Sequence, residues 1–116
     1  MQHNFSLQPF NTFGIDVKAK HFATFSNITE LQTALNEGPK EALLILGGGS
    51  NMLFTKDFDG LVLRNEIKGV SVVKETDSQV FVKAGAGEVW HTFVQHCIAQ
   101  NWCGLENLSL IPGSVG

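Results

Sequence analysis

Apolar residues recur at helical spacing in an early segment of the chain, residues 27–37. One face of a helix with ~3.6 residues per turn would carry its largest apolar side chains, Ile28, Leu31 and Leu35. Asn27 can cap such a helix, and Glu30 stands three residues later, as in a capping box. Gly38 and Pro39 then supply a stop signal. The pattern predicts a helix over residues 27–37 with Asn27 as its N-cap.

A second helical pattern runs over residues 88–100. Its apolar side chains form two rows at a spacing of four, Val89-Phe93-Cys97 and Trp90-Val94-Ile98. Residues four apart lie on the same side of a helix, so the two rows make one apolar stripe. The pattern therefore predicts a helix whose stripe faces the core, with Cys97 buried there.

Other segments show the patterns of strands. Residues 21–25 alternate well enough for a short strand, and residues 42–46 form a continuous apolar run bounded by turn residues. Such a run is typical of a fully buried strand in a parallel sheet. Three further strands are expected, at residues 61–63, 70–74 and 80–82. Residues 76–78 can form a hairpin turn between the last two. Residues 1–20, which contain Pro9 and Gly14, are expected to form a loop.

Strands and helices interleave along the chain, and the two strands of the expected hairpin are antiparallel. This arrangement predicts an α+β fold, a mixed sheet with flanking helices, and not a doubly wound parallel sheet. The length of 116 residues suits one domain. Hydrophobic residues make up 43% of the chain, a fraction typical of a globular protein with a core.

Charge and cysteine content argue against several classes of protein. The formal charge is −3, whereas proteins that bind nucleic acids or anionic membranes need clustered Lys and Arg. No stretch approaches the ~20 apolar residues of a membrane span, and residues 1–10 lack the features of a signal peptide. Cys97 and Cys103 do not make a disulfide framework. We expect a cytoplasmic, reduced protein with no nucleic-acid or membrane partner.

The most informative motif is a glycine-rich loop directly after the apolar run of residues 42–46. It reads Gly47-Gly48-Gly49-Ser50-Asn51. Consecutive glycines permit positive φ angles and let backbone N–H groups converge on an anion, to which Ser50 and Asn51 can add donors. A phosphate or pyrophosphate suits this loop, and a tight turn without a ligand is the alternative.

Two common phosphate-binding motifs do not fit this loop. A Rossmann fingerprint needs a glycine three residues after Gly49, where Met52 stands, and a helix next. A P-loop needs Gly-Lys and then Ser or Thr after its glycines, and this tripeptide is absent.

Two further glycine clusters occur later in the chain. Gly85-Ala86-Gly87 joins an expected strand to the second helix and suits a compact turn, although helix N-termini also favour anions. The other cluster is Pro112-Gly113-Ser114-Val115-Gly116. It follows an apolar stretch, and such an ending suggests a cut within a structured region. Three glycine clusters in one small domain favour a bound nucleotide-like cofactor.

Other polar clusters are weaker candidates for chemistry. Residues 57–60, Asp-Phe-Asp-Gly, lack the further ligands of a calcium loop, so an Asp-Gly turn before a strand is expected. His91 and His96 are about 140° apart around a helix of ~3.6 residues per turn, so we expect them on its polar face and not as a metal pair. No base is placed near Cys103 by spacing, and no catalytic triad is evident.

Several segments together resemble one family. Residues 11–16, Asn-Thr-Phe-Gly-Ile-Asp, resemble its N-terminal signature, and residues 46–53 resemble its pyrophosphate loop. Residues 104–108, Gly-Leu-Glu-Asn-Leu, running into residues 111–116, resemble its next flavin-contacting segment. In this order, the motifs resemble those of the UDP-N-acetylenolpyruvoylglucosamine reductases, flavoproteins with a fold of the vanillyl-alcohol-oxidase type.

The resemblance implies both a fold and a reaction. Two α+β subdomains, here approximately residues 1–65 and 66–116, hold FAD between them, and the family's separate substrate domain is absent from this chain. The family belongs to peptidoglycan synthesis. Its members are oxidoreductases that use NADPH and FAD to reduce a nucleotide sugar, UDP-N-acetylglucosamine enolpyruvate, to UDP-N-acetylmuramate.

The cofactor-binding residues carry over motif by motif. The family's FAD-diphosphate loop matches Gly47, Gly48, Gly49, Ser50 and Asn51. The segment lining the diphosphate and flavin matches Pro112, Gly113, Ser114, Val115 and Gly116. The family's catalytic residues lie beyond the last matching motif, so no catalytic or metal-binding residue is assigned. The resemblance implies an incomplete, inactive part of the reductase, and a stand-alone FAD- or nucleotide-binding module without catalysis is the alternative.

Overall fold

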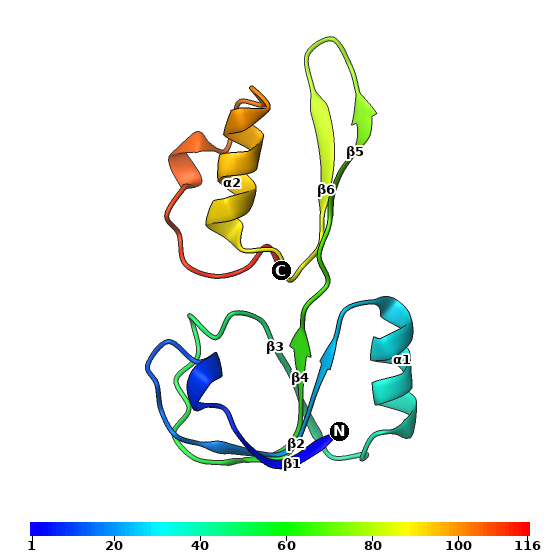
Figure 1. Cartoon of the computed structure of the whole chain (residues 1–116), viewed down its shortest axis with the longest axis vertical. Helices are drawn as coiled ribbons and strands as arrows, with labels where there is room; N and C mark the ends of the chain where they lie inside the picture. Colours follow the sequence, from blue (N-terminus) through cyan, green and yellow to red (C-terminus); the bar gives the residue numbers. More distant parts are fainter.

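The computed structural model describes residues 1–116 as two halves stacked along the longest axis of the molecule (Figure 1). The molecule measures 51 × 31 × 16 Å along its principal axes. The first half contains one sheet and helix α1, and the second contains a hairpin and helix α2. Residues 66–69 connect strand β4 of the first half to strand β5 of the second (Figure 1).

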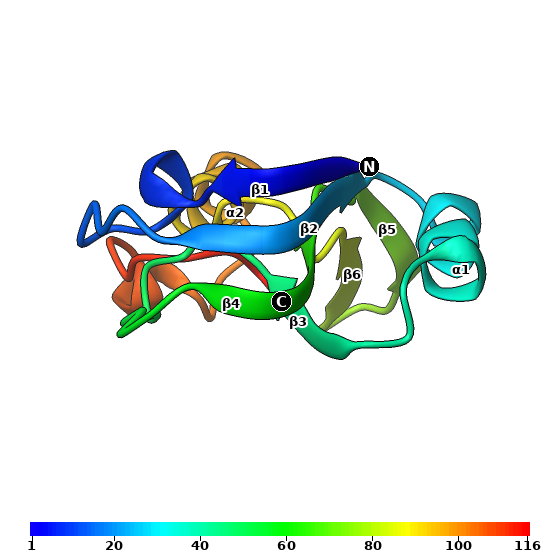
Figure 2. The same ribbon diagram turned by 90° about the horizontal axis from the view of Figure 1, so that it is seen from below.

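The first half is built on a four-stranded sheet with the strand order β1-β2-β4-β3. Its elements in chain order are β1 (Gln2–Ser6), the 3-10 helix η1 (Gln8–Phe10), β2 (Lys18–Phe25), α1 (Ile28–Glu37), β3 (Ala42–Leu46) and β4 (Phe58–Asn65). β4 pairs in parallel with β2 and with β3, whereas β1 pairs antiparallel with β2. Figure 2 shows β1, β2 and β4 side by side, with α1 beyond one end of them. The predicted mixed sheet is confirmed.

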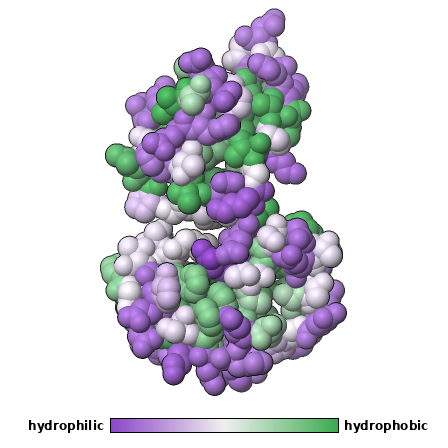
Figure 3. All heavy atoms as spheres, viewed as in Figure 1, coloured by the Kyte–Doolittle hydropathy of each residue, from purple (hydrophilic) through white to green (hydrophobic).

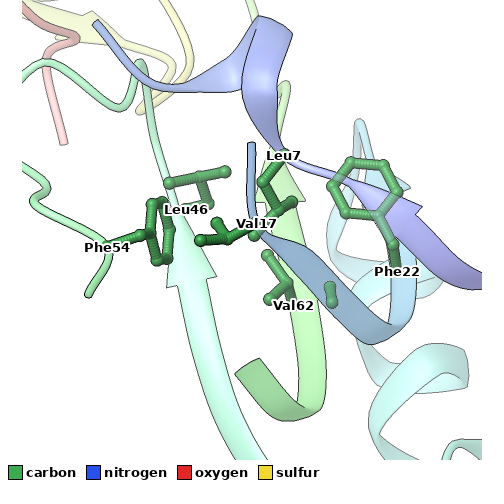
Figure 4. Close-up of a cluster of buried hydrophobic side chains, with 7 residues drawn as sticks. Leu7, Val17, Phe22, Leu46, Phe54 and Val62 are labelled. Carbon is green, nitrogen blue, oxygen red and sulfur yellow. The ribbon is translucent and has the colours of Figure 1, made fainter. Parts of the chain in front are cut away.

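The hydrophobic core lies on both faces of strand β4. Val62 belongs to a cluster on one face, drawn in Figure 4, and Leu61 and Leu63 belong to a cluster on the other. The first cluster consists of Leu7, Val17, Ala19, Phe22, Leu46, Phe54 and Val62. The second is covered by Leu31 and Ala34 of α1. Both clusters of buried side chains therefore belong to the first half.

Strand β3 confirms one prediction from the sequence and contradicts another. It pairs in parallel as expected, but Leu43 and Ile45 are each 47% exposed, so the strand is not fully buried. The cause is its position at the edge of the sheet. Leu43 and Ile45 pair with Leu61 and Leu63 and lie on the same face of the sheet. On that face, α1 covers the central strands β2 and β4 but not β3. A local apolar run does not distinguish an edge strand from a central one.

Two predictions near the strands are wrong. The expected loop of residues 1–20 contains β1, η1 and the start of β2, because the polar segment of β1 is held by its backbone ladder with β2. The expected Asp-Gly turn at residues 57–60 is instead the start of β4. Gly60 lies inside that strand, where a Cβ atom would come within 2.2 Å of the Ala42 carbonyl oxygen. This glycine permits close pairing with β3.

The second half has few buried side chains of its own, and hydrophobic residues show on its surface (Figure 3). Its elements are β5 (Val70–Glu75), β6 (Val80–Ala84), α2 (Trp90–Ala99) and the 3-10 helix η2 (Glu106–Leu108). The antiparallel β5-β6 hairpin is confirmed, with Thr76 N–H donating to the Gln79 carbonyl at 2.8 Å. Only part of the apolar stripe of α2 is buried, namely Phe93, Val94 and Cys97. Neither α1 nor α2 has the length and apolar character of a membrane-spanning helix.

Helix α1 shows the predicted cap. Asn27 Oδ1 accepts from the Glu30 N–H at 2.8 Å. The Glu30 carboxylate in turn accepts from the Ser26 N–H at 2.7 Å and the Ser26 hydroxyl at 2.9 Å, one residue before the expected partner. These bonds, above all the one from the Ser26 backbone, lower the pKa of Glu30 below its usual value of 4.5.

The lowered pKa of Glu30 predicts a pH-dependent contribution to stability. The carboxylate stabilises the folded state above pH 4.5, and this contribution is lost as the pH falls through the lower pKa of the folded protein. We expect Glu30→Gln to melt below the wild type at pH 7, with the difference shrinking below pH 4.5. Melting curves from pH 3 to pH 7 test this. A difference independent of pH would contradict it.

Candidate functional site

Two of the three glycine clusters face each other between the halves of the molecule, and the third, residues 85–87, is hydrogen-bonded to one of them. The first glycine loop, residues 47–51, follows the carboxyl end of β3, and the terminal segment, residues 112–116, runs back past α2 toward it (Figure 1). A Cβ atom on Gly47 would lie 2.9 Å from Ser114 Oγ, and one on Gly113 would lie 3.2 Å from Ser50 Oγ. Ligands of open parallel sheets bind outside the carboxyl ends of the strands, which is where these segments meet.

Gly49 gives the first glycine loop its shape. Its φ angle of +72° lies in the left-handed region, where side chains are disfavoured. A Cβ atom at this position would lie 1.9 Å from the Phe10 carbonyl oxygen, closer than any contact allows. The Gly49 carbonyl also accepts from the Thr12 N–H at 3.1 Å. Only glycine can therefore occupy this position against residues 7–15, the N-terminal segment.

Asn11 supports the N-terminal segment from inside. Its side chain is 6% exposed, and its amide donates to the carbonyls of Leu7 and Ile15 at 2.8 and 3.0 Å. Its Oδ1 accepts from the Ile15 N–H at 3.0 Å. These bonds close the segment that lies against Gly49. Asn11 appears in the N-terminal signature of the sequence analysis, but its supporting role becomes visible only in the structure.

The terminal segment pairs with the residues that precede α2. Trp90 N–H donates to the Gly113 carbonyl at 3.0 Å, Val115 N–H to the Glu88 carbonyl at 2.9 Å, and Gly116 N–H to the Ala86 carbonyl at 3.0 Å. The cluster at residues 85–87 forms the compact turn that was expected. Two hydrogen bonds hold it to the connection between β4 and β5: Gly85 N–H donates to the Gly69 carbonyl and Gly87 N–H to the Ile67 carbonyl, each at 2.8 Å.

The two segments that meet present a group of unused backbone donors. Outside the helices and strands, no backbone hydrogen bond uses the amide N–H of Gly47, Gly48, Gly49, Ser50, Asn51, Gly113 or Ser114. Neither segment contains a charged residue. Converging amides of this kind bind anions through their dipoles, without a formal positive charge. The arrangement is chemically suited to a phosphate or diphosphate group.

Charged groups near these segments are engaged elsewhere. Lys68 Nζ donates to the Gly87 carbonyl at 2.6 Å, and Glu88 Oε1 accepts from the Gly69 N–H at 2.8 Å. Arg64 pairs with Glu66, and its guanidinium lies 4.7 Å from the centre of the Phe10 ring. These pairings leave the neutral backbone as the main source of donors between the two segments.

Other candidate residues do not assemble into a site. The Asp57 carboxylate accepts from the Lys18 N–H at 2.8 Å, and no group of three or more His, Cys, Asp or Glu residues is arranged to hold a metal ion. Cys97 is 3% exposed, as predicted, and burial raises the pKa of its thiol. A hollow of about 780 Å³ lies away from the glycine clusters, between the β5-β6 turn and the end of α2.

The expectation for the two histidines of α2 is only half correct. His96 is exposed, and its ring meets the edge of Trp102. His91 is half-buried, and its Nδ1 accepts from the Leu110 N–H at 2.9 Å. His91 therefore contacts the stretch that leads into the terminal segment. Helical spacing could not indicate this contact, because its partner lies 19 residues further along the chain.

Comparison with known proteins agrees with this geometry. The model of a family described as FAD binding domain matches residues 19–116. The chain is 53% identical over 116 residues to the UDP-N-acetylenolpyruvoylglucosamine reductase of Flavobacterium johnsoniae, covering all of this chain and 34% of that protein. It is 49% identical over 117 residues to the reductase of Pseudomonas putida, covering 99% of this chain and 34% of that protein.

A solved structure shares the fold. The crystal structure of the UDP-N-acetylenolpyruvylglucosamine reductase from Thermus caldophilus superposes with a TM-score of 0.71 at 26% identity. The match covers 97% of this chain and 38% of that one. The chain thus spans about a third of the length of the curated relatives it matches. It belongs to the FAD-binding-domain family and, within it, to the UDP-N-acetylenolpyruvoylglucosamine reductases, as their N-terminal FAD-binding portion.

Proposed function

We propose that the protein binds the diphosphate of FAD between the first glycine loop and the terminal segment. The observation that carries this proposal is the convergence of the two segments with their unused N–H groups. The residues that would hold the group are Gly47, Gly48, Gly49, Ser50 and Asn51 on one side and Pro112, Gly113, Ser114, Val115 and Gly116 on the other. Bound FAD would supply the capacity for hydride transfer, and the chain would supply its position.

The shape of the loop supports a diphosphate ligand. Side chains at Gly47 and Gly48 would occupy the space between the segments, since a Cβ on Gly48 would lie 3.8 Å from Gly113 Cα. Their absence exposes the backbone to a ligand. The two halves, residues 1–65 and 66–116, would act as the two subdomains that hold the cofactor between them.

We further propose that the full-length protein reduces UDP-N-acetylglucosamine enolpyruvate to UDP-N-acetylmuramate with NADPH, as a step of peptidoglycan synthesis. The support is the similarity to reductases of that name over the whole chain. In the family, the proton donor and substrate-binding residues lie in segments beyond those matched here. The role of these 116 residues would be to bind and orient the cofactor.

The first prediction concerns Gly49. We expect Gly49→Val to weaken FAD binding by the full-length protein at least about tenfold, because the left-handed conformation costs a side chain about 1–2 kcal/mol and this site adds an overlap with Phe10. Titration of the apoprotein with FAD, followed by flavin fluorescence, measures the change. Gly14→Val is the matched control, since Gly14 has φ +63° with no atom near its Cβ position. Unchanged flavin content in Gly49→Val would count against the assignment of the loop.

The second prediction separates binding from catalysis. The isolated 116-residue chain should show no NADPH-dependent reduction of the enolpyruvyl substrate, because the family's catalytic residues lie outside it. The full-length protein should show a flavin absorption spectrum and turnover. Turnover by the pure 116-residue chain would refute the assignment of its role. Flavin binding without turnover in the full-length protein would favour a binding module without catalysis.

A further inference from the structure

Leu110 has an unusual backbone conformation close to the terminal segment. Its φ angle is +63°, in the left-handed region that side chains disfavour. The other non-glycine residues with positive φ are Asn4 and Asn101, and asparagine tolerates this region through local hydrogen bonds of its side chain. Leucine has no such means, and the Leu110 side chain is 77% exposed, so packing does not hold it either. Its conformation must be held through its backbone.

The start of helix α2 supplies that hold. His91 Nδ1 accepts from the Leu110 N–H at 2.9 Å. The neighbouring Trp90 donates from its indole nitrogen to the Leu108 carbonyl at 2.8 Å and from its backbone N–H to the Gly113 carbonyl at 3.0 Å. Trp90 and His91, two consecutive residues of α2, thus hold the backbone of residues 108–113 at three positions. In Figure 1 the chain leaves η2, descends beside α2 and then passes between α2 and the first half of the molecule.

We propose that His91 is a positioning residue for the cofactor. By accepting the Leu110 N–H, it keeps Leu110 in the left-handed conformation and so keeps Gly113 and Ser114 opposite the first glycine loop. The inference rests on the proposed binding of FAD diphosphate between these segments. His91 acts through the backbone of the terminal segment and needs no contact with the cofactor itself. What it must offer is an acceptor at the place of Nδ1, with the ring proton on Nε2.

Substitutions that move the acceptor test this role in the full-length protein. The side-chain oxygen of asparagine can occupy the place of Nδ1, whereas that of glutamine reaches the place of Nε2. We expect His91→Phe and His91→Gln to raise the dissociation constant of FAD about 3- to 10-fold, the range for loss of one hydrogen bond. We expect His91→Asn to stay within about 2-fold of the wild type, because the hydrogen bond is retained. His96→Phe, on the same helix, is the matched control and should bind FAD as the wild type does.

The melting temperature of the apoprotein is the second readout. It should stay near the wild-type value in all four variants, because the stretch that this bond positions, residues 108–113, contains no buried residue and belongs to neither hydrophobic cluster. Equal affinities of His91→Phe and the wild type would overturn the inference. So would a loss in His91→Asn as large as in His91→Gln, or losses of affinity that follow the melting temperature. If His91→Phe does not fold, the Asn and Gln variants decide alone. Failure of the wild type to bind FAD would overturn the proposed function itself, and this inference with it.

Discussion

The architecture between the two halves depends on close backbone approach. At Gly49, the chain passes so near the Phe10 carbonyl that no Cβ atom fits. At Gly47, a Cβ atom would lie 2.9 Å from the Ser114 hydroxyl oxygen. These contacts place the carboxyl end of β3, the N-terminal segment and the terminal segment within reach of one another. Backbone amides are the groups that such an approach exposes. The chemistry of the site, neutral donors that face an anion, follows from the same constraint.

The two halves contribute to this arrangement in different ways. The first half contains both hydrophobic clusters, so the first glycine loop projects from a packed sheet. The second half buries only three side chains, all of them on α2. Its terminal segment and the stretch before it are held by hydrogen bonds with residues 86–91. One side of the site therefore rests on packing and the other on directional bonds. Directional bonds are lost one at a time, so the second side is the more sensitive to changes of single polar groups.

Local signals predicted those elements that local interactions form. Helix α1 was predicted with its cap because Asn27 and Glu30 act within one turn of the helix. Strand β1 was missed because its residues are polar and its partner β2 supplies the structure. The prediction that β3 is fully buried was wrong, because edge and central positions depend on strand order, which local patterns do not contain. The glycine segments could be named from their motifs, but that they meet, and that His91 reaches Leu110, depends on long-range folding.

The site reaches the left-handed backbone region by two routes, and they differ in what they tolerate. At Gly49, the conformation is available because no side chain is present, and the neighbouring carbonyl excludes every replacement that adds a Cβ. At Leu110, the side chain is retained and exposed, and the conformation depends on an acceptor supplied by another residue. The first position can therefore change only with loss of the loop. The second can change freely in its side chain, provided that the acceptor at residue 91 is preserved. The first glycine loop thus depends on a residue of its own, Gly49. The geometry of the terminal segment depends largely on residues of the preceding helix α2.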